Sequence, residues 1–393
     1  MGNINLSVFK YFFASKTAGG ILLILCVIVS LLIANLNSGP AFAKLLESPL
    51  GGSIGDIDLK YPLLIWINDG LMAIFFLLVG LEIKRELVEG ELSSPSQAAL
   101  PAFAALGGMA VPALIFALFN NNTPTANGWG IPMATDIAFA IAILAMLGDK
   151  VPSSIKIFLT ALAIVDDLGA ILVIAIFYSS SLHTGYLIAA AALFGGLIII
   201  NRFKVMNLWF YLIPGVVLWY LIHHSGIHAT VAGVLTALTI PTTPDDTESP
   251  LEKLEHFLTR PVNFIIMPIF ALANTNITFQ SDFAEAVFSN MGMGILLGLM
   301  VGKPLGIYFM SWISVKVGLG VLPDGTHWSQ IAAVGVLGGI GFTMSVFMAM
   351  LSYKDPLLQS QAKLVILLAS VLAGIIGFLA LKYIYRINSI KKL

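Results

Sequence analysis

The stretch "ALAIVDDLGAILV", residues 161–173, places two adjacent aspartates, Asp166 and Asp167, in the middle of an otherwise apolar run. A carboxylate at the middle of a bilayer costs about 2.5–3.5 kcal/mol on insertion scales, so ionisable groups at that depth indicate function. Asp166 follows Lys156 by about ten residues, or about 15 Å of helix, which puts the pair near the middle of a span. Consecutive helical side chains point about 100° apart, so both can border one cavity. A structural salt bridge would need only one aspartate, and the doubling therefore predicts a binding site.

The composition is that of an integral membrane protein. The chain has 393 residues, of which 58% are hydrophobic and only 10% are charged, against about 25% in ordinary soluble domains. Its mean hydropathy is +0.94. The net charge is −1 and like charges form no block, which argues against a nucleic-acid-binding surface. The single cysteine, Cys26, excludes an intrachain disulfide and a cysteine metal cluster.

Apolar runs long enough to cross a bilayer, about 20 residues each, predict an all-α polytopic protein with about twelve transmembrane helices in one transporter domain over residues 1–393. The predicted spans cover residues 14–36, 61–83, 97–119, 124–148, 154–178, 184–201, 205–222, 226–241, 258–275, 290–315, 328–352 and 360–384. The main hydrophilic loops are predicted at 37–60 and 242–257. A Gly-Gly turn in the first loop is compatible with an external β-hairpin over about 45–60 or with an irregular loop.

The distribution of basic residues orients these spans. Fourteen of the 20 Lys and Arg residues fall on the side that holds both chain ends: Lys10, Lys16, Lys84, Arg85, Lys150, Arg202, Lys204, Lys253, Arg260, Lys316, Lys382, Arg386, Lys391 and Lys392. The opposite side holds three, which are Lys44, Lys60 and Lys354. By the positive-inside rule, both termini are expected to be cytoplasmic.

Two of the predicted spans are interrupted. In the fourth, Gly128, Gly130 and Pro132 break the helical pattern before Thr135 and Asp136. In the eleventh, four glycines lie mid-span within "GVLGGIGFTMS". Each is the middle member of a possible triplet, spans 3–5 and 10–12, and the two triplets would have opposite orientation. Interrupted segments at corresponding positions of an inverted repeat indicate the binding site of a transporter.

Several motifs together resemble the bacterial sodium/proton antiporters of the NhaA family. They are "PMATDIAFAIAIL", "FLTALAIVDDLGAI", "GKPLGI" and "GGIGFTMS", with "LLVGLEIKRELVEGEL" at 77–92, "SGIHATVAG" at 225–233 and "LEHFL" at 254–258. The resemblance implies that Asp166 and Asp167 bind the cation and the protons, with Lys303 as charge partner of Asp166. It also implies that spans 4 and 11 cross at the midplane. Asp136 would balance the N-terminal ends of the broken helices and Lys303 their C-terminal ends, and Thr135 would line the crossing.

The resemblance extends to residues outside this centre. A cluster associated with the pH response would be formed by Glu82, Arg85, Glu86, Glu255 and His256, although ordinary surface ion pairing is an alternative for each. His228 would act in the same response, or would be an interfacial histidine held by a hydrogen bond. Asp69 resembles an intramembrane acid typical of the family, or forms a packing hydrogen bond between helices. The neighbouring His223 and His224 are expected to be ordinary side chains.

The function expected from these features is secondary active transport: an electrogenic, pH-regulated Na⁺(Li⁺)/H⁺ antiporter of the bacterial inner membrane, working by alternating access. The expected substrates are Na⁺, Li⁺ and H⁺; no cofactor and no enzymatic activity are expected, and the family suggests a homodimer. A sodium-coupled symporter of an organic anion is the alternative. An intramembrane aspartyl protease would use Asp136 and Asp166, but its Gly-x-Gly-Asp signature is missing. Paired buried charges also disfavour a channel, because they bind cations too tightly for fast flow.

Overall fold

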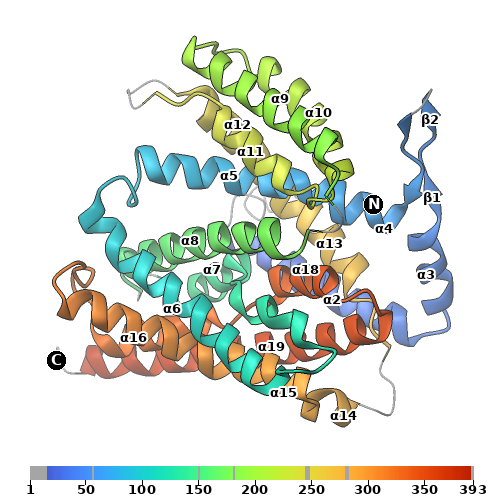
Figure 1. The fold of residues 1–393 in the computed structure, drawn as a ribbon. Helices are drawn as coiled ribbons and strands as arrows, with labels where there is room; N and C mark the ends of the chain where they lie inside the picture. The colour runs from blue at the N-terminus through green and yellow to red at the C-terminus, as the bar shows by residue number, and fades with distance from the viewer. Residues whose placement is uncertain are drawn as a thin grey trace, which may run out of the picture. The chain divides into compact units, whose positions relative to one another are not determined.

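The chain is built almost entirely of helices, as the computed structural model shows (Figure 1). The structure describes residues 16–54, 57–148, 151–179, 182–243, 248–278 and 283–390. The extreme ends, predicted to be cytoplasmic, and the tip of the predicted hairpin at 55–56 lie outside these residues. By Cα proximity the chain divides into two compact units. The first comprises Met1–Ile28, Pro95–Asp166 and Phe279–Leu393, and the second comprises Val29–Ser94 and Asp167–Thr278.

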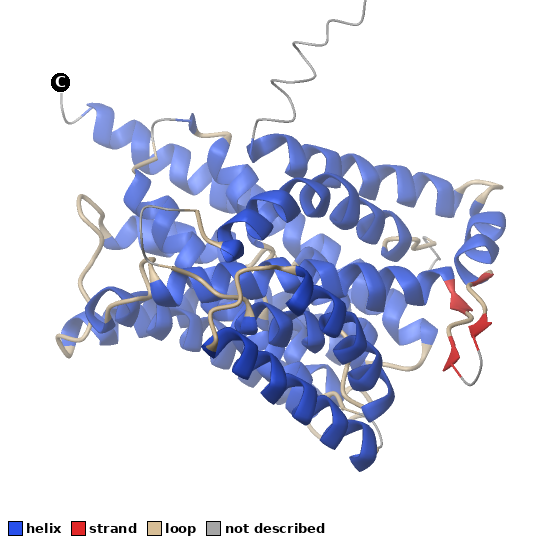
Figure 2. Cartoon of the chain, turned by 90° about the horizontal axis from the view of Figure 1, so that it is seen from above, coloured by secondary structure: helices blue, strands red, loops and turns tan. Residues whose placement is uncertain are grey.

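The strands are confined to the segment 49–62 among the described residues, as the red arrows in Figure 2 show. Strand β1 (Pro49–Leu50) pairs antiparallel with β4 (Tyr61–Pro62), and β2 (Ser53–Ile54) pairs with β3 (Ile57–Asp58). Of the two alternatives for the predicted loop at 37–60, a hairpin over about 45–60 or an irregular loop, these pairs favour the hairpin. The same segment also holds helix α3 (Gly39–Glu47), which has a proline in its first turn and buries Leu46. An external position of the hairpin remains a prediction.

The first unit contains the predicted triplet of spans 3–5 up to Asp166, and the predicted triplet of spans 10–12 in full. Its helices are the start of α2 (Lys16–Asn35), α6 (Pro95–Asn120), η2 (Ala126–Met133), α7 (Ile137–Ala145), the first part of α8 (Ser153–Phe177), α14 (Phe283–Phe288), α15 (Asn290–Leu297), η5 (Gly298–Gly302), α16 (Lys303–Lys316), α17 (Trp328–Gly338), α18 (Phe342–Ser352) and α19 (Pro356–Ile390). Here η2 is a 3₁₀ helix and η5 is a π-helical turn.

The second unit holds the remaining elements. Besides α3 and the strands, its helices are the end of α2, α4 (Leu63–Ile65), η1 (Trp66–Leu71), α5 (Met72–Val88), the end of α8, α9 (Thr184–Arg202), α10 (Trp209–Ser225), α11 (Val231–Thr239), α12 (Pro250–Pro261), η4 (Val262–Ile266) and α13 (Met267–Asn274). Both η1 and η4 are π-helical turns.

Helix α12 begins eight residues before the expected position 258, so the second hydrophilic loop is shorter than predicted. The cause is local. Ser249 and Glu252 form a reciprocal capping box that satisfies the first backbone N–H groups of the helix. Leu251 and Leu254 then bury an apolar face. These first turns are polar on average, but together with η4 and α13 they form a helix, Pro250–Asn274, that is long and apolar enough to cross a membrane.

Within the described residues, nine helices are long and apolar enough to cross a membrane, or ten if α17 and α18 form one span bent by 47°. The polytopic all-α class is thus supported, but the count of twelve is not confirmed. The seventh predicted span is a helix of 17 residues, and the eighth is α11, with nine. Nine residues of α-helix rise only about 14 Å, against about 30 Å of hydrocarbon.

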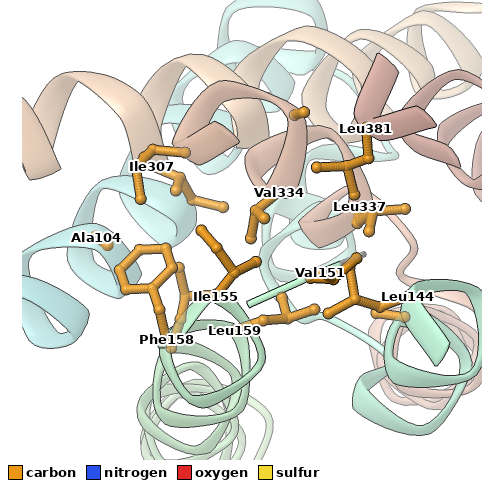
Figure 3. Packing of buried hydrophobic residues seen from close by; sticks show 14 of the residues in the cluster. Ala104, Leu144, Val151, Ile155, Phe158, Leu159, Ile307, Val334, Leu337 and Leu381 are labelled. Atoms are coloured by element: carbon orange, nitrogen blue, oxygen red, sulfur yellow. The ribbon is translucent and has the colours of Figure 1, made fainter. Parts of the chain in front are cut away.

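A core of apolar side chains fixes the first part of α8 inside the first unit (Figure 3). Ile155 and Phe158 of α8 lie in one buried cluster with Ile307 of α16 and Val334 of α17, and side chains of α6, α7 and α19 complete it. Because packing of this kind leaves little freedom to rotate a helix, it sets the direction in which Asp166, about two turns further on, points.

Two glycines let α6 and α16 approach each other closely, side by side in Figure 1. A Cβ atom on Gly306 would lie 2.0 Å from the carbonyl oxygen of Gly107, and one on Gly107 would lie 2.1 Å from that of Gly306. Small residues at such positions are the usual means of tight helix packing in membranes. This contact holds Lys303, one turn before Gly306, against α6.

Candidate functional site

The two aspartates of the opening stretch are buried side chains on an unbroken helix. Asp166 is 0% exposed and Asp167 is 2% exposed. Helix α8 continues without interruption through both, so their side chains diverge by about 100°. The boundary between the two compact units falls between them. The two acids therefore point in different directions on α8.

Lys303 is fully buried and forms an ion pair with Asp166. Its Nζ donates to Oδ2 of Asp166 and to the backbone carbonyl of Met133. The π-helical turn η5 directly precedes Lys303, and irregular turns of this kind often occur at functional sites. An isolated ammonium in a dry interior is very costly, so this pairing is what makes each of the two charges tolerable.

Thr135 joins Asp166 to the other broken segment. Its hydroxyl Oγ1 lies 2.7 Å from Oδ2 of Asp166 and 2.9 Å from the carbonyl oxygen of Gly338. Thr135 belongs to the non-helical residues between η2 and α7, while Gly338 is the last residue of α17. The two interruptions predicted from sequence therefore lie next to each other, within one unit.

Asp136 accepts hydrogen bonds from the N-terminal ends of α7 and α18, the helices that follow the two breaks. Its Oδ1 accepts the backbone N–H of Phe139 (3.0 Å), which caps α7, and its Oδ2 accepts the N–H (3.1 Å) and hydroxyl (2.5 Å) of Thr343 on α18. Its own N–H donates to the carbonyl of Ile340 at 2.6 Å. A carboxylate at this place is favoured because helix N-termini carry positive partial charge.

The last carbonyl groups of η2 and α17, the helices before the breaks, have hydrogen-bond donors beside them instead of acceptors. Met133 ends η2 and its carbonyl oxygen accepts from Lys303, while Gly338 ends α17 and its carbonyl oxygen lies 2.9 Å from the hydroxyl of Thr135. Backbone groups at a helix break need partners at membrane depth, because no water is present in the hydrocarbon. The side chains at the break supply these partners.

One carboxylate oxygen of this site can accept further hydrogen bonds. Oδ1 of Asp166 is buried and has no hydrogen-bond partner among the described residues, whereas Oδ2 accepts from Lys303 and lies beside Thr135. An ionised carboxylate can accept about four hydrogen bonds. Chemically, Oδ1 can take a proton or ligate a hard monovalent cation, for which carboxylate and hydroxyl oxygens are suitable ligands.

The other predicted acid, Asp69, lies in the second unit on η1. Its carboxylate is 3.5 Å from Nε2 of His228 and 3.6 Å from Nδ1 of His223. His228 is oriented through its second ring nitrogen by the hydroxyl of Thr230 (2.9 Å), and the ring of His223 stacks on Trp219. The structure thus joins Asp69 and His228, and adds His223, which was expected to be an ordinary side chain.

The residues predicted for the pH response are only partly brought together. Arg85 bonds Glu86 (3.1 Å) and Glu255 (3.0 Å), which links α5 to α12, and Glu82 lies one turn before Glu86. His256 instead forms an exposed pair with Glu248 at 3.1 Å. It belongs to a surface contact with Glu248, the residue before the N-cap of α12.

Several residues that complete the site were not identified from sequence. Thr343 bonds Asp136, Ser345 donates to the carbonyl of Ile131 (2.7 Å), and Ser370 of α19 accepts the N–H of Phe342 at the start of α18 (3.0 Å). All three hydroxyls are buried. The usable signal was the position of Thr343 and Ser345 directly after a glycine break, while Ser370 stands in a regular helix and gives none.

Comparison with known proteins gives a match along almost the whole chain. Residues 10–381 match the family model described as Na⁺/H⁺ antiporter 1. A curated protein of Flavobacterium johnsoniae, Na⁺/H⁺ antiporter NhaA 2, is 62% identical over 379 residues, which is 96% of this chain and 93% of the relative. Na⁺/H⁺ antiporter NhaA of Dechloromonas aromatica is 51% identical over 379 residues, 95% of each chain. That of Cytophaga hutchinsonii is 50% identical over 374 residues, again 95% of each.

Proposed function

The chain belongs to the Na⁺/H⁺ antiporter 1 family, and on this premise we propose that it exports Na⁺ or Li⁺ from the cell in exchange for protons. The relatives are named as antiporters, which favours exchange over the alternative, a sodium-coupled symporter of an organic anion. The family is one of transporters, so we expect no catalysed covalent chemistry and no cofactor.

The observation that supports this proposal most strongly is the buried Asp166 with its unpartnered Oδ1, held between Lys303 and the broken segments. We assign cation and proton binding to Asp166 and Asp167, with Lys303 as charge partner of Asp166. A cation and protons cannot occupy the same carboxylate oxygens together. Competition for these oxygens couples the two flows without any direct contact between the ions.

The number of carboxylates supports an electrogenic exchange. Two aspartates can carry two protons in for each monovalent cation carried out, so one net positive charge moves inward per cycle. That charge gains about 2.3 kcal/mol per 100 mV of membrane potential, which would drive export against a sodium gradient. A reversal potential measured at known Na⁺ and H⁺ gradients gives this ratio directly.

We propose alternating access around the two broken segments, which cross at the midplane of the bilayer. This proposal is supported by the contact of Thr135 with Gly338 of α17, by the hydrogen bond that Asp136 donates to Ile340, and by the one that it accepts from Thr343 of α18. Binding sites of inverted-repeat transporters lie at such breaks. In the cycle, the inward-facing site exchanges protons for a cation, and the outward-facing site releases the cation and takes up protons again.

Two groups of ionisable residues outside the Asp166 site are candidates for the pH response. We propose that the Arg85 cluster with Glu82, Glu86 and Glu255, and the Asp69 pair with His228, take part in the pH response, whereas the exposed His256 contributes less.

We place the protein in the bacterial inner membrane with both termini cytoplasmic. We also propose a homodimer, with the hairpin at 45–60 as the contact.

The proposal is tested by Na⁺-driven proton flux in everted membrane vesicles or proteoliposomes. Asp166→Asn and Asp167→Asn should each reduce flux at least about 100-fold, because each removes a charge that binds the cation. Asp324→Asn, the same change at an exposed loop residue, is the matched control and should exchange normally. Normal exchange by either buried variant would overturn the site, and Na⁺ uptake that needs an organic anion and moves no protons would indicate the symporter.

A further inference from the structure

The hydroxyl group of Thr135 faces two acceptors at once. Oγ1 is within hydrogen-bond distance of Oδ2 of Asp166 (2.7 Å) and of the Gly338 carbonyl oxygen (2.9 Å), and the side chain is fully buried. A threonine hydroxyl has one proton to donate, and a carbonyl and an ionised carboxylate have none. While Asp166 is ionised, the hydroxyl can therefore satisfy only one of these two acceptors at a time.

The charge of Asp166 decides which acceptor receives the proton. A hydrogen bond to an ionised carboxylate is about twice as strong as one between neutral groups, so the charged, cation-free Asp166 takes the proton and Gly338 loses this donor. When a proton or a cation neutralises Asp166, that preference is lost. The hydroxyl then donates to Gly338, and its lone pairs are free to accept from a protonated Asp166 or to ligate the cation.

We propose that Thr135 is a positioning residue that transmits the occupancy of Asp166 to the end of helix α17 by turning its hydroxyl from Asp166 to Gly338. The O–H bond stays intact throughout, since only the Cβ–Oγ1 bond rotates. The proposal rests on the proposed function for the identity of the cation. It does not depend on which ion neutralises Asp166, because protons alone would turn the hydroxyl as well.

The location of Gly338 gives this rotation a mechanical consequence. Gly338 ends α17, and α18 begins at Phe342 after a bend of 47°. The intervening Ile340 is bonded to Asp136 of the other broken segment. A donor gained or lost at the last carbonyl of α17 therefore changes the hydrogen bonding at the joint itself, where small backbone rotations move a whole half-helix.

The test uses infrared difference spectra of the full-length protein in lipid, with its glycines labelled by ¹³C at the carbonyl. Na⁺ addition at alkaline pH, and separately acidification without Na⁺, should each shift one glycine carbonyl band to lower frequency as it gains a hydrogen bond. The band should be missing in Gly338→Ala, which assigns it. That variant should fold, because the added Cβ would be too close only to the end of the flexible Ile307 side chain, at 2.8 Å, and would lie at ordinary contact distance from Cγ of Lys303 (3.8 Å) and Oγ1 of Thr135 (4.0 Å).

Substitutions at Thr135 separate a turning hydroxyl from a fixed one. Thr135→Val, which keeps the shape but has no hydroxyl, should abolish both band shifts and raise the KM for Na⁺ about tenfold, for one lost hydrogen bond to a charged group. Thr135→Ser should restore the shifts and keep KM within about twofold. Ser345→Ala removes a buried hydroxyl that bonds a single carbonyl in the same region, and should leave both shifts in place.

The outcomes distinguish this inference from the function on which it rests. If wild-type vesicles exchange Na⁺ for protons but the Gly338 band stays fixed on Na⁺ addition and on acidification, the inference is wrong and the antiporter stands. If acidification shifts the band but Na⁺ neither shifts it nor drives proton flux, the hydroxyl turns as proposed and the proposed function fails. If Thr135→Val shows the same band shifts as wild type, Thr135 is not the donor and the inference is overturned.

Discussion

Thr343 donates both its backbone N–H and its hydroxyl to the same oxygen of Asp136, and so ties the start of α18 to the break between η2 and α7. The same carboxylate caps α7 through Phe139. One acid therefore serves the N-terminal ends of two half-helices that are far apart in the sequence. The integrity of the joint depends on the donors that hold this acid.

Thr343→Val should weaken this joint. The change removes one hydrogen bond to a charged group, which typically contributes about 1.5–3 kcal/mol, and leaves the shape of the side chain nearly unchanged. The melting temperature in mild detergent, followed by size-exclusion fluorescence, should fall. Thr343→Ser keeps the hydroxyl and should melt close to wild type; equal melting of the valine variant and wild type would show that the hydroxyl contributes nothing.

Removing Lys303 should be rescued by removing the charge of its partner. Lys303→Met leaves Asp166 unpaired in a dry interior, and loss of one partner of a buried pair typically costs about 3–5 kcal/mol. Adding Asp166→Asn removes the remaining charge, so the double variant should be more stable than Lys303→Met alone. Thermal melting of the four proteins measures the coupling. Additive losses would mean that the two residues do not stabilise each other.

Gly306 should tolerate no side chain. A Cβ there would lie 2.0 Å from the backbone oxygen of Gly107, which cannot move aside as a flexible side chain could. Gly306→Ala should separate α6 from α16, displace Lys303, and reduce both the folded yield and Na⁺/H⁺ exchange. The matched control is Gly196→Ala on α9, where an added Cβ meets nothing within 4 Å. A fully active Gly306→Ala protein would contradict the close approach of the two helices.

The pair formed by Arg85 and Glu255 should survive exchange of its charges. Arg85 is one-third exposed and Glu255 nearly buried, so Arg85→Glu and Glu255→Arg should each lower stability and distort the pH profile of exchange. The double variant should recover part of both, with a coupling of about 0.5–3 kcal/mol. His256→Gln, at the exposed pair with Glu248, should change the pH profile little. A larger effect at His256 than at Arg85 would reverse the proposed assignment.

The sequence was most informative where a residue conflicts with its surroundings. Charges such as Asp166 and Lys303 stand out in an apolar chain because burying them is expensive, and the glycine and proline breaks stand out because they interrupt long helical runs. The helical membrane class followed from the composition together with the apolar runs of about 20 residues. Even so, no principle of composition predicts that Lys303 also bonds the carbonyl of Met133, since that contact depends on how α16 packs.

What sequence reasoning missed depends on tertiary packing or weak local signals. His223 looked ordinary beside His224, and only the packing of α10 near η1 brings its ring to Asp69. Hydroxyl residues such as Ser370 are common in membrane helices and carry no mark of their role. The early start of α12 was missed because its first turns are amphipathic and polar on average, which a search for long apolar runs overlooks.

If Na⁺ and protons compete for Asp166 and Asp167, binding of Na⁺ releases protons. Purified protein in weakly buffered detergent solution at alkaline pH is mixed with NaCl, and the change in pH is recorded with choline chloride as the ionic-strength control. We predict that Na⁺ releases up to two protons per protein, that Li⁺ does the same, and that Asp166→Asn and Asp167→Asn release fewer. Na⁺ binding without proton release, or equal release from both variants and wild type, would mean that Na⁺ and protons do not compete for these two aspartates.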